Sequence, residues 1–211
     1  MIEVVKWDPH EMANYDEVLE AGCAAELQGL LEASSQERLE FITDPRTVHE
    51  RLYAKLTPLQ CPEYAGTYRG TNGTTLANRR SGVTRDDDGT FQEFVAPEGV
   101  ASNLDRIAVQ AGKVFSLSPG TDVATILREI AILFYIFGLV HPFLDGNGHV
   151  QRLIFAACVI ERNEIELSEA WTIHPRPYDV EIKHAFEAAT AAKRIISLIG
   201  VLKAYVRVRD Q

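Results

Sequence analysis

Residues 141–152 read His141-Pro142-Phe143-Leu144-Asp145-Gly146-Asn147-Gly148-His149-Val150-Gln151-Arg152. A long apolar stretch precedes this segment, and Pro142 disfavours continuation of a helix through it. Glycines on both sides of Asn147 form a turn that leads directly into a new helix. The first backbone N–H groups of such a helix, together with its dipole, favour an anion. The segment therefore predicts an anion-binding loop between two helices.

The side chains of this loop suit phosphate chemistry. Asp145 offers a carboxylate to a hard cation such as Mg²⁺, and Arg152, one turn into the new helix, offers a guanidinium to a phosphate. His141 is a candidate base, and Phe143 is interpreted as a core anchor that orients the loop. A base, a carboxylate, backbone donors and a cation in one short segment fit phosphoryl or nucleotidyl transfer.

Each of these features also has a plainer interpretation. A histidine at a helix end is often only a cap, and Asp-Gly-Asn-Gly is often only a turn. Two other ligand-binding loops are excluded. In an EF-hand that begins at Asp145, Val150 would stand at the required glycine and Ala156 at the closing glutamate. In a dinucleotide fingerprint, Gln151 would stand at the third glycine.

Helical patterns surround the loop on both sides. The helix before it is expected from about residue 123 to 140, capped by Thr121 or Asp122, and is apolar nearly all round, which is typical of a central helix. The helix after it is expected from about 148 to 162. Another begins at Pro97, where apolar residues at 100, 104, 107, 108 and 111 form one face.

The ends of the chain also read as helical. In the first 57 residues, Asp8-Pro9 and Asp44-Pro45 are helix-start signals, and Ser34 with Glu37 has capping-box spacing. Two further helices are expected from about 178 to 208, with Val206 in a buried stripe of the last one. Between these helical regions, two β-prone runs, 83–85 and 90–95, flank the turn-forming residues 86–89, which predicts one β-hairpin.

The pattern as a whole predicts an all-α bundle with one inserted β-hairpin, in a single domain over residues 1–211. Within it, residues 1–57 form N-terminal helices, 58–96 contain the hairpin, 97–162 form the central core with the loop, and 163–211 form C-terminal helices.

Composition excludes several classes of protein. The chain has 211 residues, 46% of them hydrophobic, and a formal net charge of −9, which is unfavourable for binding nucleic acid or an anionic membrane surface. Three scattered cysteines without a C-x-x-C pair argue against a disulfide framework and a structural zinc site. No secretory signal is visible at the N-terminus, and the longest apolar run, Ile130 to Val140, is too short to cross a bilayer. We expect a soluble cytoplasmic protein.

Segment 141–152 resembles the signature of the Fic (Fic/Doc) family, H-x-F-x-[D/E]-G-N-G-R-x-x-R. The matching residues are His141, Phe143, Asp145, Gly146, Asn147, Gly148 and Arg152. The family places this loop between two central helices of an all-α domain and has a hairpin flap upstream, where residues 82–95 lie here. Gly66-Thr67-Tyr68-Arg69 is similar to a stretch common before that flap.

The resemblance implies transfer of a nucleotide monophosphate, most often AMP from ATP, to a protein hydroxyl. It implies that His141 takes the proton of the target hydroxyl and that Asp145 holds Mg²⁺ or Mn²⁺. It also implies that Gly146, Asn147 and Gly148 cradle the phosphates and that Arg152 binds the end of the phosphate chain. The target protein is expected to dock on the flap, about Gly82 to Val95.

His149 departs from the signature, which has an arginine there. Imidazole lacks the bidentate fork of guanidinium and is mostly neutral at pH 7, so we expect His149 to make a weakened phosphate contact. If so, His149→Arg should increase transfer from ATP. The alternatives are a degenerate Fic domain that binds a nucleotide or a partner without transfer, or an enzyme that uses another donor, such as one of UMP or phosphocholine.

Many Fic proteins carry an inhibitory helix with the sequence [S/T]-x-x-x-E-[G/N]. Here Thr125 is the one Ser or Thr with a glutamate four residues on, and Ile130 follows that glutamate. No internal inhibitor is therefore visible. We expect either a separate inhibitory protein, as in toxin–antitoxin members of the family, or another kind of control.

Overall fold

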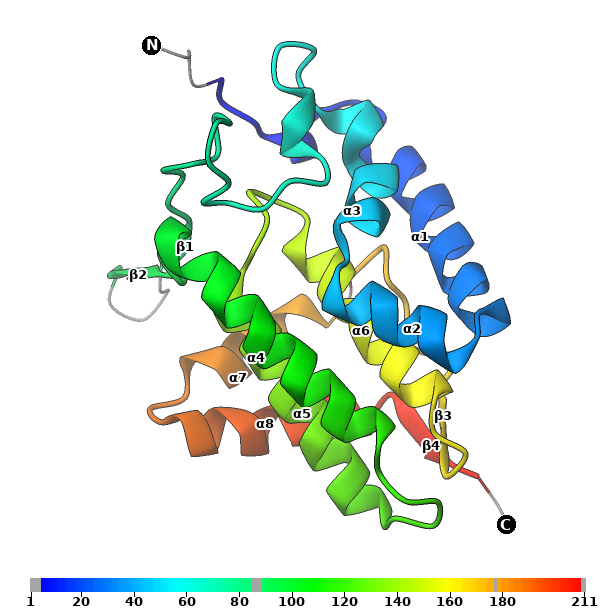
Figure 1. Ribbon diagram of the computed structural model, residues 1–211. Coiled ribbons are helices and arrows are strands. Elements are labelled where there is room, and N and C mark those ends of the chain that lie inside the picture. The colour runs from blue at the N-terminus through cyan, green and yellow to red at the C-terminus, as the bar shows by residue number, and fades with distance from the viewer. Residues whose placement is uncertain (1–4, 85–88, 177, 210–211) are drawn as a thin grey trace.

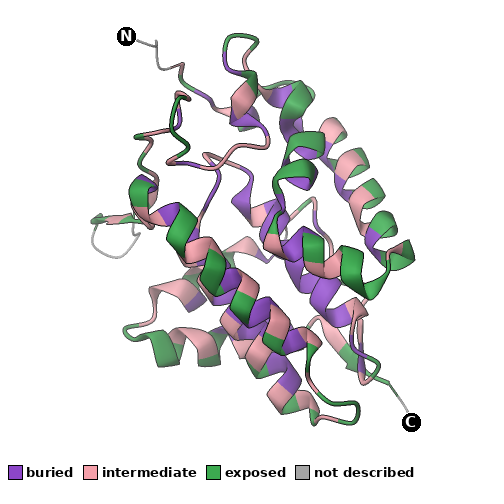
Figure 2. Ribbon diagram, viewed as in Figure 1, coloured by how far each residue is buried: buried purple, intermediate pink, exposed green. Residues whose placement is uncertain are grey.

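Two helices form the centre of the molecule. The computed structural model describes residues 5–84, 89–176 and 178–209. In it α5 (Val123–Val140) and α6 (Asn147–Ile160) pack against each other and are joined by residues 141–146. Figure 2 shows that α6 is buried along almost its whole length. Both helices confirm the sequence prediction closely, because their apolar patterns and the Gly-Asn-Gly turn are strong local signals.

The other helices surround this pair (Figure 1). Helices α1 (Tyr15–Glu32) and α2 (Ser35–Thr43) pack on α6, while α3 (Arg46–Tyr53) packs on α1. Helix α4 (Pro97–Phe115) packs on α5 and α2. Helices α7 (Asp179–Glu187) and α8 (Ala191–Lys203) pack on each other, and α8 also contacts α5. The described part of the chain is thus an all-α bundle with small strand pairs.

The predicted helix starts differ in accuracy. The Ser34 hydroxyl accepts a hydrogen bond from the Glu37 N–H at 3.2 Å, and the Glu37 carboxylate accepts one from the Ser34 N–H at 2.7 Å, which confirms the capping box. Asp122 caps α5 by accepting from the Thr125 N–H at 2.9 Å. By contrast, Asp8-Pro9 begins only a 3₁₀ turn, Pro9–Glu11, and α1 starts at Tyr15. The Asp8 side chain makes no cap there and pairs with Lys6.

Short strands form two antiparallel pairs. Strands β1 (Gly82–Thr84) and β2 (Phe91–Glu93) confirm the predicted hairpin, although residues 85–88 of its turn lie outside the described residues. Strands β3 (Ile165–Leu167) and β4 (Val206–Val208) form a second antiparallel pair that we did not predict. Helix α8 therefore ends at Lys203, and the prediction of a helix through Val206 is wrong. Val206-Arg207-Val208 alternates as a strand does, and its partner lies far away in the sequence.

Helix α5 is long and apolar enough to cross a membrane by length and composition, and 56% of it is buried inside the bundle. It is covered by α4, α6 and α8, as expected of the central helix of a soluble bundle. Cys23, Cys61 and Cys158 are buried and unpaired.

Candidate active site

The loop between α5 and α6 is shaped by its own side chains. His141 caps the C-terminus of α5 with a φ of 48°, the one positive φ at a non-glycine position among the described residues. Asn147 brackets Phe143: its Oδ1 accepts a hydrogen bond from the Phe143 N–H, and its Nδ2 donates to the Phe143 carbonyl, both at 2.9 Å. The Asn147 amide, expected to cradle phosphate, is therefore used to hold the loop, and its backbone N–H is what remains for an anion.

The buried His49 of α3 packs against the loop. Phe143 is fully buried, and His49 stacks on it with ring centroids 3.8 Å apart and 5° between the planes. The His49 Nδ1 accepts a hydrogen bond from the Gly66 N–H at 2.9 Å, so its Nε2 donates to the Asp145 carbonyl at 2.9 Å. Burial lowers the pKa of His49 to about 4. A neutral imidazole thus ties α3 and residue 66 to the loop.

The candidate base, His141, lies beneath the hairpin. The Phe94 ring stacks on the imidazole with centroids 3.7 Å apart and 8° between the planes. Burial and the positive charge of Arg69 lower the pKa of His141 to about 3. The ring is therefore neutral at pH 7, and a neutral imidazole can accept a proton.

Arg69 fixes the backbone at this point. Its guanidinium is 1% exposed and donates to the His141 carbonyl from Nε at 2.9 Å and from Nη2 at 2.7 Å. It also donates to the carbonyls of Val140 and Val95 at 3.0 Å and of Arg79 at 3.2 Å. The buried Arg69 guanidinium therefore links the end of α5 to the segments just before and just after the hairpin.

These elements enclose a cleft of about 350 Å³. The sequence-predicted residues that line it are His141, Asp145, Gly146, Asn147, Gly148 and Arg152. Val83, Gln92 and Phe94 of the hairpin region form one wall, and residues of α7 form another. The structure thus brings the predicted base, carboxylate, loop and arginine into one cavity.

Asp145 presents its carboxylate to this cleft. Its Oδ1 accepts a hydrogen bond from the Gly146 N–H, and its Oδ2 lies 3.7 Å from His10 Nε2. Burial raises the pKa of the carboxyl, opposed by the Gly146 N–H and by the charges of His10 and Arg176. No group of three or more His, Cys, Asp or Glu able to hold a metal is found among the described residues. A single carboxylate fits a Mg²⁺ ion that shares its other ligands with substrate phosphates and water.

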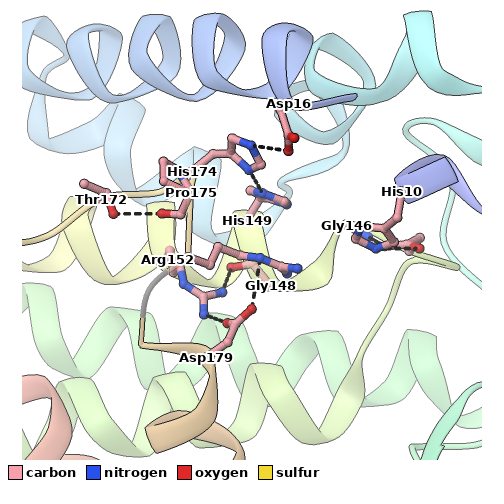
Figure 3. Close-up of polar contacts among 12 residues, drawn as sticks. His10, Asp16, Gly146, Gly148, His149, Arg152, Thr172, His174, Pro175 and Asp179 are labelled. Atoms are coloured by element: carbon pink, nitrogen blue, oxygen red, sulfur yellow. Dashed lines mark hydrogen bonds and ion pairs between the residues drawn. The ribbon is translucent and has the colours of Figure 1, made fainter. Parts of the chain in front are cut away.

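His149 does not line the cleft. Its ring is fully buried and hydrogen-bonds to Tyr53 through one nitrogen and to His174 through the other. Figure 3 shows the contact with His174. Asp16 can only accept, so His174 Nε2 donates to it at 3.1 Å, and His174 Nδ1 accepts from His149 Nε2 at 3.1 Å. His149 Nδ1 then accepts from the Tyr53 hydroxyl at 2.7 Å. Both ring nitrogens are used inside the protein, which does not fit the expected phosphate contact of His149.

Arg152 lines the cleft but already has an anionic partner. Its side chain is 2% exposed, donates from Nη1 to the Gly148 carbonyl at 2.8 Å, and pairs through Nη2 with Asp179 at the start of α7 (Figure 3). Its guanidinium also lies 5.0 Å from the centre of the Tyr178 ring. Its Nε is buried without a hydrogen-bond partner in the described structure. The arginine is thus held in place by a carboxylate.

The family-model comparison matches residues 42–159, more than half of the chain, to the Fic/DOC family. The chain belongs to the Fic/DOC family. A search of curated proteins finds no match.

Solved structures confirm the Fic fold. The N-terminal Fic domain of a Bartonella effector protein from Bartonella sp. AR 15-3 matches with a TM-score of 0.58 and 17% identity, covering 94% of this chain and 85% of that one. A Fic domain of a Bartonella quintana protein with bound ADP has a TM-score of 0.57 and 17% identity, covering 96% and 90%. BepC from Bartonella tribocorum with bound AMPPNP has a TM-score of 0.61 and 14% identity, covering 95% and 91%.

Several residues of this Fic domain's site had no signal in the sequence. Their positions are Asp16, His49, Tyr53, His174, Arg176 and Asp179. They lie on α1, on α3 and in the segment around the start of α7, far from the signature, and none belongs to a short motif. Only the fold brings them to the loop.

The position of His149 changes what His149→Arg should do in this Fic domain. A guanidinium at 149 would replace a buried neutral ring, and overpacking of this kind costs about 1–3 kcal/mol. We expect a lower melting temperature and no gain in ATP turnover. Thermal melts and turnover assays of His149→Arg, with His184→Arg on the exposed face of α7 as control, test this. A stably folded His149→Arg variant with clearly increased turnover would instead support a weakened phosphate contact at His149.

Acid should destabilise this Fic domain before most carboxylates titrate. The pKa of His49 falls from 6.5 to about 4 on folding, so between these values the unfolded chain binds a proton that the folded chain does not. Stability therefore falls as the pH falls through this window. His141 acts in the same direction, and Asp145, whose pKa is raised, acts in the opposite one. His49 alone contributes a loss of roughly 3 kcal/mol by pH 4.

Urea denaturation followed by tryptophan fluorescence between pH 7.5 and 4.5 measures this loss. His49→Gln keeps a donor and an acceptor but cannot titrate, so its stability should depend less on pH. A free energy of unfolding that stays constant from pH 6.5 to 4.5 in the unaltered protein would show that these histidines are not buried in the neutral form.

Proposed function

We propose that this Fic domain is a nucleotidyltransferase that transfers AMP from ATP to a hydroxyl side chain of a target protein. The observation that carries the proposal is a neutral imidazole, His141, in the same cleft as a helix N-terminus and a buried arginine. The first N–H groups of α6 have no acceptor within the helix and suit phosphate oxygens. The ADP and AMPPNP named with two Bartonella neighbours support a nucleotide in this cleft.

In the proposed reaction, His141 accepts the proton of the target hydroxyl as its oxygen attacks the α-phosphorus of ATP. A new oxygen–phosphorus bond forms, the bond from the α-phosphorus to the bridging oxygen breaks, and pyrophosphate leaves with that electron pair. The Gly146 N–H already donates to Asp145 Oδ1, so the backbone N–H groups of Asn147 and Gly148 hold phosphate oxygens where negative charge is concentrated. Preorganised donors of this kind supply a large share of catalysis in acyl and phosphoryl transfer.

Asp145 is the residue that would hold Mg²⁺ or Mn²⁺, which neutralises phosphate charge when bound. Excess chelator should therefore abolish transfer. Asp145→Asn, which keeps the size of the side chain, should reduce transfer strongly at a fixed metal concentration and raise the concentration needed for half-maximal rate. Titration of transfer rate against Mg²⁺ measures both effects. Full activity in excess chelator would exclude a metal at Asp145.

The hairpin region is the proposed docking site for the target protein, over about Gly82 to Val95. Val83 and Phe91 expose 43% and 62% of their surface, and Gln92 lines the cleft beside His141. A target segment that adds to a strand here by main-chain hydrogen bonds would carry its hydroxyl toward His141. Phe94, stacked on His141, keeps the base under that segment.

Labelled donors offered with a cell lysate test the proposal. ATP, UTP and CDP-choline, each labelled on the group to be transferred, separate transfer of AMP, UMP and phosphocholine. Protein labelling from ATP supports the proposal, and labelling from another donor alone reassigns the donor. Nucleotide binding by calorimetry without labelling from any donor would favour the degenerate, binding-only alternative.

A further inference from the structure

We propose that Arg176 replaces the arginine that the signature lacks at position 149, and that Arg176 and Arg152 together bind the terminal phosphates of the nucleotide. This inference rests on the proposed function, because it names the group that a triphosphate donor would contact. It also assigns Asp179 a role as the anion that the phosphates displace.

The position of Arg176 carries the inference. A Cβ atom added to Gly148 would lie 2.8 Å from Arg176 Nη1 and 2.9 Å from Arg152 Nη1. The two guanidinium groups therefore lie against the same glycine, in the first turn of α6. Both residues line the cleft that contains His141 and Asp145. Two cations at a helix N-terminus form a strong anion site.

Asp179 holds this pair of arginines in the structure. Its Oδ1 pairs with Arg152 Nη2, and its Oδ2 lies 3.1 Å from Arg176 Nε. The Asp179 side chain is 43% exposed, so it can turn out to solvent. Asp179 thus pairs with both arginines at once, and the buried Nε of Arg152 has no partner in the described structure. Phosphate groups bring more negative charge and more acceptor oxygens than one carboxylate.

The same packing that turns His149 inward carries Arg176 to the cleft. His174, two residues before Arg176, accepts the hydrogen bond from His149 and donates to Asp16, and Thr172 donates to the Pro175 carbonyl at 2.8 Å. The two contacts of His174 dock segment 172–176 onto α6 and α1, and the Thr172 hydrogen bond closes a turn within the segment. The His149 imidazole therefore anchors segment 172–176, and this segment places the Arg176 guanidinium in the cleft.

Calorimetric titration of ATP, AMP and inorganic pyrophosphate tests the inference. Arg176→Gln should weaken ATP and pyrophosphate binding at least tenfold and AMP binding less than threefold, because AMP lacks the terminal phosphates. Arg176→Lys should lose less affinity than Arg176→Gln. The matched control is Arg128→Gln, which removes the same charge from a side chain that is 64% exposed on α5 and should leave all three affinities unchanged.

The Asp179→Asn variant provides a second, independent test of the inference. Because it removes the competing anion, it should increase pyrophosphate affinity severalfold, whereas a merely structural aspartate would give no increase. Equal ATP and pyrophosphate affinities in folded Arg176→Gln and in the unaltered protein would overturn the inference and leave the proposed function standing. If the unaltered protein binds pyrophosphate through Arg176 but not ATP, the arginine pair is supported and the proposed function fails. Binding of neither ligand overturns both.

Discussion

Replacement of His141 by alanine is expected to reduce transfer by about 10²–10⁴-fold, the usual contribution of a general base. The neutral ring lines the cleft beneath Phe94, where no other described imidazole lies. The residue has a positive φ of 48°, which alanine tolerates poorly, whereas asparagine adopts it more readily. His141→Asn therefore removes the base while keeping the loop, and both variants should show this reduction.

Two controls make this test of His141 specific. His184→Ala removes an exposed imidazole from α7 and should leave transfer unchanged. Nucleotide binding by His141→Asn should stay within a few-fold of the unaltered protein, because His141 acts on the target hydroxyl rather than on the phosphates. Transfer at a near-normal rate by folded His141→Asn would show that another group accepts the proton.

Arg69→Met is expected to lower the free energy of unfolding by about 3–5 kcal/mol. The buried guanidinium donates to four backbone carbonyls, those of residues 79, 95, 140 and 141. Methionine fills part of the volume but leaves these acceptors without their donor. Because one of them belongs to His141, transfer should fall along with stability.

Urea denaturation of Arg69→Met measures this loss of stability. Arg80→Met is the matched control, since Arg80 is 69% exposed and its ion pair with Glu93 spans 3.4 Å at the surface. An exposed pair of this kind contributes about 0–1 kcal/mol. If the two variants lose similar amounts of stability, Arg69 does not join the hairpin to the end of α5 as described.

Local signals explain how much of the fold could be predicted. The capping groups Ser34 and Asp122, the apolar pattern of α5 and the turn before α6 each act over a few residues, and the structure confirms them. The β3–β4 pair could not be predicted, because each strand is three residues long and becomes stable only when the other lies beside it.

The site was predictable where the signature specifies it. Segment 141–152 indicated the base, the carboxylate and the arginine that line the cleft. The orientation of His149 was not predictable, because α6 is buried on nearly every side and its pattern does not reveal which face meets the cleft. Arg176 and Asp179 reach the cleft through docking of a segment that has no helical or strand periodicity to place it.

The position of a radioactive label in ATP gives the most direct test of nucleotidyl transfer by this Fic domain. Purified protein, Mg²⁺ and a lysate are incubated with ATP labelled on either the α- or the γ-phosphate, and protein-bound label is measured with and without the His141→Asn substitution. We predict protein-bound label from the α-phosphate, none from the γ-phosphate, and loss of the signal in His141→Asn. Protein labelled from the γ-phosphate alone, or labelled equally well by His141→Asn, would contradict the account.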